Sequence, residues 1–267
     1  MHMIQFTDKI FDTLPVKDRQ AEPWNKAISA LAAAFEHFNA RRAEELLKNL
    51  EKELCYERIL ENEDSFFIHQ PIFVVLKRKI ASLYANSNDL PRANIVSQRA
   101  VTQSLDIVGF ECDSSLFASD DNLAETNIHN ALLALTSYGA IKHLLDSKSR
   151  SDSGKAAKKK SKSPQCVLPD EEFDLETESF SYLMRGAFEY ALLLIDSDMG
   201  TFNCFCQFLR DSLLFLAQDN VEKESLVFQE LRALRLKLME HFEENKETQD
   251  EISEALSLMV KEKQIAA

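Results

Sequence analysis

Apolar side chains recur three or four positions apart along most of the chain, and the stretch 202–216 shows this spacing most clearly. Its apolar residues are Phe202, Phe205, Phe208, Leu209, Leu213 and Leu216, with Cys204, Leu214 and Phe215 beside them. Residues three and four apart share one face of a helix, so the spacing predicts a largely buried helix. The charged pair Arg210–Asp211 interrupts the stripe and is expected to face solvent.

The same period predicts helices along the rest of the chain. The expected helices cover 23–63 (as one or two elements), 71–86, 90–108, 123–145, 175–196 and 201–218, and two amphipathic stripes follow at 231–242 and 252–260. Residues 1–22 are also amphipathic, and Pro15 should end any helix there. The segment Phe66 to Pro71 is expected to be a break, with Pro71 opening the next helix.

A polar segment, 147–172, interrupts this pattern. It is rich in Ser and Lys, contains two prolines, and has almost no apolar residue before Val167. Such a segment buries too little surface to offset the entropy of ordering it, so we expect a disordered linker. The whole chain, 1–267, is otherwise expected to form a single helical domain in which 221–267 supplies extra C-terminal helices.

The composition favours an all-α fold. The 267 residues include only 5 Gly and 6 Pro, so turn formers are scarce and the elements should be long. No stretch alternates apolar and polar residues in the manner of a half-buried strand. We therefore expect a right-handed array of about nine to eleven antiparallel helices, comparable to a tetratricopeptide-like solenoid.

The net charge, the apolar runs and the cysteines indicate which partners and which cellular compartment to expect. A net charge of −13 and a pI near 5.0 disfavour nucleic acid as a partner, although a local basic groove can exist on an acidic protein. The longest apolar runs, such as 188–195, are too short and too interrupted to cross a membrane. The 5 cysteines are odd in number and scattered, which favours reduced thiols in a cytoplasmic protein. The lysines of 158–162 match a nuclear signal weakly.

No motif for catalysis is present. The chain has no Gly-rich phosphate loop, no Gly-x-Ser-x-Gly turn and no His-Glu-x-x-His. Cys204 and Cys206 lie two apart on a predicted helix and so point in different directions, without a second Cys or His pair to complete a zinc site. We expect no metal, no cofactor and no enzymatic activity. A helical enzyme with a site built from helix side chains is the alternative class.

Two groups of cationic residues are candidates for binding. Lys77-Arg78-Lys79 interrupts an otherwise apolar helix, and Arg41-Arg42 lies in an earlier one. Each group is typical of a solvated helix face. The alternative is that the two helices are antiparallel neighbours whose cations form a phosphate clamp, because guanidinium groups bind phosphate oxygens in pairs and lysine adds a compact charge.

The string Gln207-Phe208-Leu209-Arg210-Asp211-Ser212-Leu213, followed by Asp219, resembles the last helix of the 14-3-3 family. Two earlier segments resemble that family's helices in the same order. One runs from Ala134-Leu135-Thr136 to Leu144-Leu145-Asp146-Ser147, and the other from Ala187-Phe188-Glu189-Tyr190-Ala191 to Ile195-Asp196. The resemblance covers roughly residues 70–220, and it implies a 14-3-3-like helical array with a concave peptide groove.

The resemblance also implies a set of groove residues. Lys77 and Tyr84 fall in the segment that resembles the family's fifth helix, and Thr136 and Ser212 take the places of asparagines that hold the peptide backbone. Ala40-Arg41-Arg42 resembles an Ala-Arg-Arg string on the third helix. The phosphopeptide-binding residues implied in this way are Arg41, Arg42, Lys77, Arg78, Tyr84, Leu135, Thr136, Phe208, Ser212 and Leu216.

This chain departs from the family pattern at several of these places. Leu83 stands where the family has an Arg before the Tyr, His143 replaces a Glu, and Leu216 replaces a Trp. The interval from Arg42 to Lys77 is also much shorter than in the family. These departures predict that phosphate affinity is weakened, and they leave the alignment of residues 1–69 open.

The leading functional hypothesis is a non-catalytic adaptor that binds phosphoserine or phosphothreonine segments of client proteins. The alternative is a tetratricopeptide-like interaction scaffold without phosphate dependence. The string Arg150-Ser151-Asp152-Ser153 resembles the motif that 14-3-3 proteins bind, so phosphorylated Ser153, or the tail, is a candidate internal ligand. The family dimerises through N-terminal helices. The part of this chain before residue 70 is short by more than one helix, so we expect the usual dimer to be lost or rebuilt, and a homodimer is left open.

Overall fold

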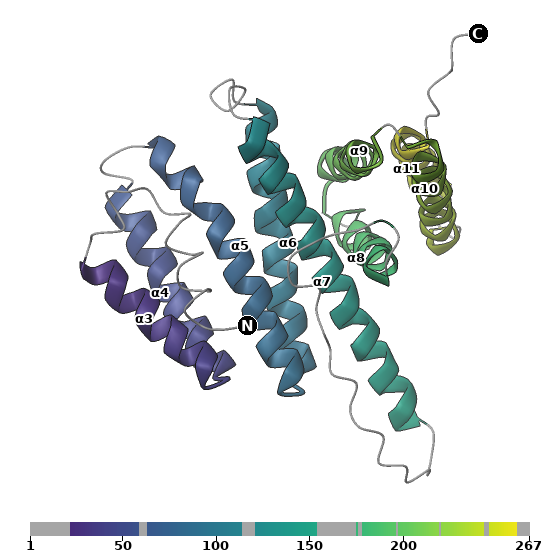
Figure 1. Ribbon diagram of the computed structural model, residues 1–267. Helices are drawn as coiled ribbons and strands as arrows, with labels where there is room; N and C mark the ends of the chain where they lie inside the picture. Colours follow the sequence, from purple (N-terminus) through teal and green to yellow (C-terminus); the bar gives the residue numbers. More distant parts are fainter. Residues whose placement is uncertain are drawn as a thin grey trace. The chain divides into compact units, whose positions relative to one another are not determined.

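The computed structural model describes residues 22–58, 63–113, 121–153, 175, 178–195, 197–218, 220–242 and 246–260. Nine helices and no strands occur in these ranges (Figure 1). The helices are α3 (Glu22–Glu36), α4 (Ala40–Arg58), α5 (Glu63–Asn86), α6 (Leu90–Asp113), α7 (Asp121–Ser153), α8 (Glu178–Ile195), α9 (Met199–Leu216), α10 (Val221–His241) and α11 (Lys246–Met259). The predicted all-α class is confirmed.

The chain divides into two compact units. The first consists of Met1–Ala134 and His143–Leu168, and the second of Leu135–Lys142 and Pro169–Ala267. The described helices of each unit pack mostly against their neighbours in the sequence. The expectation of one helical domain stays a prediction.

In the first unit, α3, α4, α5 and α6 follow one another along the chain, and the short turns 37–39 and 87–89 join α3 to α4 and α5 to α6. Apolar residues at helical spacing form its core, among them Leu31, Ala43, Leu47, Ile80, Ala93 and Val101, all of which are at most 2 % exposed. The turns after α3 and α5 close in the same way. Phe38 and Asn88 both have a positive φ, and the following amide donates to the carbonyl five residues earlier. Helices commonly end in this manner, with Gly or Asn at the left-handed position.

The second unit holds the 135–142 segment of α7 together with α8, α9, α10 and α11. Its buried residues include Leu135, Tyr138, Leu183, Phe202, Leu209, Leu213 and Leu256. The helix predicted around 202–216 is present as α9, and Asp198 caps it by accepting hydrogen bonds from the backbone amides of Gly200 and Thr201. The acceptor satisfies amides that have no partner inside the helix.

Helix α11 packs against α9 and α10, and one polar contact ties its end to α9. Arg210 Nη1 donates to the carbonyl of Leu258 at 2.8 Å. The Arg210 side chain also pairs with Asp211, but it is only 20 % exposed, whereas Asp211 is 52 % exposed. The expectation that both charges face solvent is therefore wrong for Arg210, because its guanidinium satisfies a carbonyl in the last turn of α11.

The observed start of α5 differs from the expected start at Pro71. Residues 66–71 are not a break, because α5 runs continuously from Glu63 to Asn86 with Pro71 inside it. Proline removes one helical hydrogen bond, but the next turn buries Ile72, Phe73, Val74 and Leu76, whose packing opposes that loss.

Helix α7 extends to Ser153, so residues 147–153 of the expected linker are helical. No Gly or Pro occurs there before Gly154, and Ser147 donates back to the carbonyl of His143 at 2.8 Å. Lys148 Nζ also donates to Asn88 Oδ1 at 3.2 Å. The remaining residues of the expected linker, 154–172, lie outside the described residues. The amphipathic residues 1–21 lie outside them as well.

Candidate functional site

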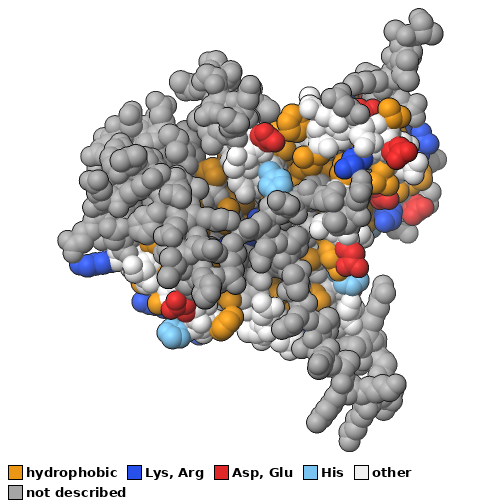
Figure 2. Space-filling view, viewed as in Figure 1, with side chains coloured by type: hydrophobic (Ala, Val, Ile, Leu, Met, Phe, Trp, Pro, Cys, Tyr) orange, Lys and Arg blue, Asp and Glu red, His pale blue; other side chains and the backbone are white. Residues whose placement is uncertain are grey.

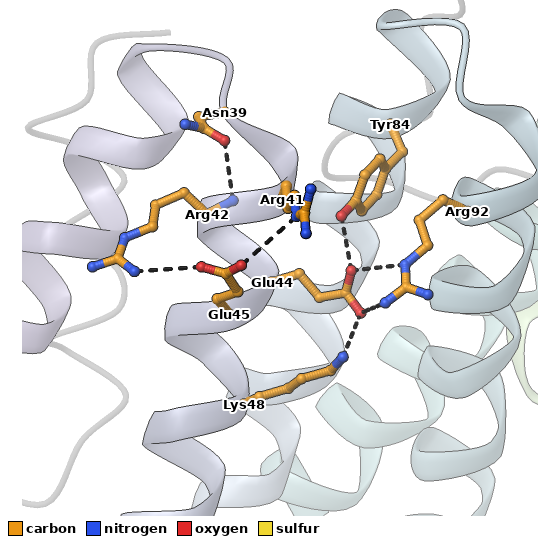
Figure 3. A network of polar contacts seen from close by, with 8 residues as sticks. All are labelled: Asn39, Arg41, Arg42, Glu44, Glu45, Lys48, Tyr84 and Arg92. Carbon is orange, nitrogen blue, oxygen red and sulfur yellow. Dashed lines mark hydrogen bonds and ion pairs between the residues drawn. The ribbon is translucent and has the colours of Figure 1, made fainter.

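A buried carboxylate on α4 collects polar side chains from three helices of the first unit. The Glu44 side chain is 8 % exposed. Tyr84 Oη donates to its Oε2 at 2.8 Å, and Arg92 donates to both oxygens, from Nε at 2.9 Å and from Nη2 at 2.6 Å. Lys48 Nζ lies 2.9 Å from Oε1. Figure 3 shows these side chains converging on Glu44.

A fifth residue, Arg99, extends this group, with Nη1 3.7 Å from Glu44 Oε1. We call Glu44, Lys48, Tyr84, Arg92 and Arg99 the Glu44 cluster. Each member is placed by helix geometry: Lys48 lies one turn after Glu44 on α4, Tyr84 lies in the last turns of α5, and Arg92 and Arg99 lie two turns apart on α6. The α5–α6 turn brings Tyr84 and Arg92 to the same end of the helix pair.

The contacts within the cluster shift the pKa values of Glu44, Tyr84 and Arg92. Burial alone would raise the pKa of Glu44, but hydrogen bonds from Arg92, Lys48 and Tyr84 outweigh it and lower the pKa to about 2. Burial and the hydrogen bond to Glu44 raise the pKa of Tyr84 to about 12. The hydrogen bond and charge of Glu44 raise the pKa of Arg92 as well. At neutral pH Glu44 is therefore an anion, and Tyr84 is a protonated donor.

The cluster carries more positive than negative charge. Lys48, Arg92 and Arg99 supply three positive charges and Glu44 one negative charge, which leaves a surplus of two in a chain whose net charge is −13. The three cationic side chains are 47 %, 37 % and 51 % exposed, respectively, so part of each reaches solvent. Such an arrangement can hold an anion, because guanidinium and ammonium groups donate several hydrogen bonds each.

The predicted pair Arg41 and Arg42 lies outside the cluster. Both side chains are exposed, and they share Glu45, with nitrogen–oxygen distances of 3.7 Å for Arg41 and 3.4 Å for Arg42. The backbone amide of Arg42 is also bound by the side chain of Asn39. In Figure 3 the side chain of Arg42 points away from Glu44. This pair therefore occupies a solvated face of α4, as the simpler interpretation of the sequence has it.

Lys77 and Arg78 lie further along α5. Lys77 is 15 % exposed and forms an ion pair with Glu51 at 2.6 Å, and its Nζ also contacts Gln103 Oε1. Arg78 is buried, with 8 % of its surface exposed. Of the first-unit residues that the resemblance implies, Tyr84 alone belongs to the Glu44 cluster.

The other implied residues belong to the second unit. Leu135 and Thr136 are fully buried in α7, and Ser212 is buried in α9. Phe208 and Leu216 are partly exposed on α9. A groove that joins these residues to the first-unit cations stays a prediction.

Sequence reasoning did not select Glu44, Lys48, Arg92 or Arg99. One signal was present: Arg92 and Arg99 are seven apart, so they share a face of a predicted helix. The approach of that face to Glu44 depends on how α4, α5 and α6 pack against one another, which periodicity does not describe.

A metal site has no counterpart among the residues that the structure describes. No three His, Cys, Asp or Glu side chains gather there in a way that could hold a metal ion. None of the described helices combines the length and the apolar character needed to span a bilayer.

Comparison with known proteins identifies no relative of this chain. No protein family matches the chain, and no curated protein and no solved structure is significantly similar to it.

Proposed function

We propose that this protein is a non-catalytic adaptor that binds phosphoserine or phosphothreonine segments of client proteins, with the phosphate on the solvent side of the Glu44 cluster. The observation that carries the proposal is the surplus of two positive charges in the Glu44 cluster, in a chain whose net charge is −13.

The charge of the ligand matches this surplus. A phosphoserine carries a charge of about −1.5 to −2 at neutral pH and three acceptor oxygens, whereas a single carboxylate brings one charge. Arg99 is the cation held least tightly by Glu44, at 3.7 Å, and half of its side chain is exposed. Arg99 is therefore the first partner for a phosphate oxygen, with Lys48 and the outer edge of Arg92 beside it.

The second candidate is a helical scaffold that binds clients without phosphate. Two observations favour it. Arg41, Arg42 and Lys77 are already paired with carboxylates. The second unit also exposes large apolar side chains, namely Leu193, Phe215, Val221 and Leu236. Figure 2 shows hydrophobic side chains lying between charged ones on this part of the surface.

Binding of matched peptides separates the two candidates. Phosphoserine peptides selected from a random library, and their unphosphorylated serine twins, are titrated into the full-length, unphosphorylated protein by calorimetry at low salt. We expect the phosphorylated form to bind at least about tenfold more tightly, which corresponds to about 1.4 kcal/mol, and the preference to shrink as salt rises.

Two variants with the same change in net charge locate the site. Arg99→Gln removes an exposed member of the cluster, and we expect it to abolish most of the phosphate preference. Lys237→Gln removes an exposed cation on α10 of the second unit and should leave the preference unchanged. Equal affinity of the wild-type protein for both peptides would contradict phosphate recognition and favour the phosphate-independent scaffold.

A further inference from the structure

The Glu44 carboxylate already occupies the point on which the cluster's donors converge. Its Oε1 contacts Arg92 Nη2 at 2.6 Å, Lys48 Nζ at 2.9 Å and Arg99 Nη1 at 3.7 Å. Its Oε2 accepts from Tyr84 Oη at 2.8 Å and Arg92 Nε at 2.9 Å. One buried anion thus engages all four other members of the cluster, as Figure 3 shows for Lys48, Tyr84 and Arg92.

We propose that Glu44 is an internal competing anion: it holds the cluster's donors in the absence of a ligand and lowers the affinity for any phosphate that binds there. The inference rests on the proposed function, because it concerns the same site. In this role Glu44 lowers the affinity of the cluster for phosphate, because its negative charge competes with the ligand for the same cations.

The competition has two physical sources. First, a phosphate drawn to Arg92, Arg99 and Lys48 must approach within a few ångströms of a like charge, and the repulsion is strong where burial excludes water. Second, a donor that turns towards the ligand leaves Glu44, and a buried carboxylate that loses its partners carries a desolvation cost. Protonation does not relieve the repulsion at neutral pH, because the pKa of Glu44 is about 2.

Glu44 also has little room to withdraw. Its side chain is buried between α4, α5 and α6, and Tyr84 holds it from the inner side. The ligand therefore shares the cations with Glu44 instead of replacing it. Neutralising Glu44 raises the surplus of positive charge from two to three and releases the nearer donors.

Three variants test this role. Glu44→Gln keeps the size of the side chain and removes its charge. Glu44→Asp keeps the charge but withdraws the carboxylate from the cations by one methylene group. Glu45→Gln is the matched control, since it removes a neighbouring negative charge that is 52 % exposed and pairs with Arg41 and Arg42 outside the cluster. Each variant is first checked for its helical circular dichroism.

The probes are inorganic phosphate and the phosphoserine peptide, measured by calorimetry. We expect Glu44→Gln to bind the peptide about tenfold more tightly than the wild type, with a steeper dependence on salt, and Glu44→Asp to fall between the two. Glu45→Gln should bind as the wild type does. If Glu44 only supported the fold, Glu44→Gln would bind equally or more weakly, and that result would overturn the inference.

The outcomes also separate this inference from the proposed function. Phosphate preference in Glu44→Gln but not in the wild type would refute the proposed function and support the competing role of Glu44. A preference for the phosphorylated peptide in the wild type that is lost in Glu44→Gln would support the proposed function and refute the competing role of Glu44. Absence of phosphate binding in every variant would overturn both. Should Glu44→Gln fail to fold, Glu44→Asp decides the question, because tighter binding is expected there too.

Discussion

The contact between α7 and α8 in the second unit depends on two glycines, Gly139 and Gly186. A Cβ atom on Gly139 would lie far inside van der Waals contact of the Tyr182 carbonyl oxygen and 2.6 Å from the backbone nitrogen of Gly186. A Cβ atom on Gly186 would overlap the carbonyl oxygen of Leu135. The obstacles are backbone atoms, which cannot move aside as a flexible side chain can. We therefore expect Gly139→Ala to force the two helices apart.

The size of the effect follows from two opposing terms. Alanine is favoured over glycine inside a helix by about 1 kcal/mol, which stabilises the variant. Overpacking a tight interior costs about 1–3 kcal/mol and more where the backbone must shift. Separating α7 from α8 also loosens buried neighbours such as Tyr138 and Leu183. We expect the free energy of unfolding to fall by about 2 kcal/mol or more.

Urea unfolding followed by circular dichroism measures this change. Gly200→Ala is the matched control, because Gly200 is exposed in the first turn of α9 and the atoms nearest to a Cβ there belong to the Asp198 carboxylate, the closest at 3.3 Å. The control should be as stable as the wild type or slightly more stable. A Gly139→Ala protein with the midpoint and slope of the wild type would refute the close approach of α7 and α8.

Three further changes test single features of the fold. Phe38→Gly should raise the free energy of unfolding by about 1 kcal/mol in urea, because Phe38 is 75 % exposed at φ 50°, whereas Asn88→Gly at the equivalent turn should be nearly neutral. Ionised Glu44 should contribute about 3 kcal/mol to the free energy of unfolding above pH 4.5, because its pKa falls from 4.5 to about 2 in the folded state. The stability lost in Glu44→Gln should therefore shrink as the pH falls from 4.5 towards 2. Asn220→Ala should cost about 1 kcal/mol, since Asn220 caps α10, and Gln218→Ala should cost much less.

The helices were predictable because their signal is local. Apolar spacing placed α8 at 175–196 and α9 at 201–218, and the observed bounds, Glu178–Ile195 and Met199–Leu216, differ by a few residues. The errors occurred where packing overrides local preference. Pro71 suggested a helix start, yet α5 continues through it because the following turn is buried.

The candidate site was predictable only in part. Tyr84 was selected through a resemblance, but its partner Glu44 lies 40 residues away in the sequence, and Glu44 lies 48 residues from Arg92. Hydrophobic periodicity specifies which face of each helix is buried. It does not specify how far neighbouring helices slide along one another, and that offset decides which polar side chains meet.

The comparison of Lys77 with Arg99 shows why a count of cations in the sequence is a poor guide to an anion site. Lys77 belongs to a conspicuous run of three cations, yet Glu51 neutralises it and only 15 % of its side chain is exposed. Arg99 has no cationic neighbour in the sequence, yet it shares Glu44 with two other cations and is 51 % exposed. An anion binds where positive charge remains after the internal ion pairs are formed and where that charge is exposed to solvent. By that criterion we propose the solvent side of the Glu44 cluster as the anion site, and not Lys77, which is already paired with Glu51 and links α5 to α4.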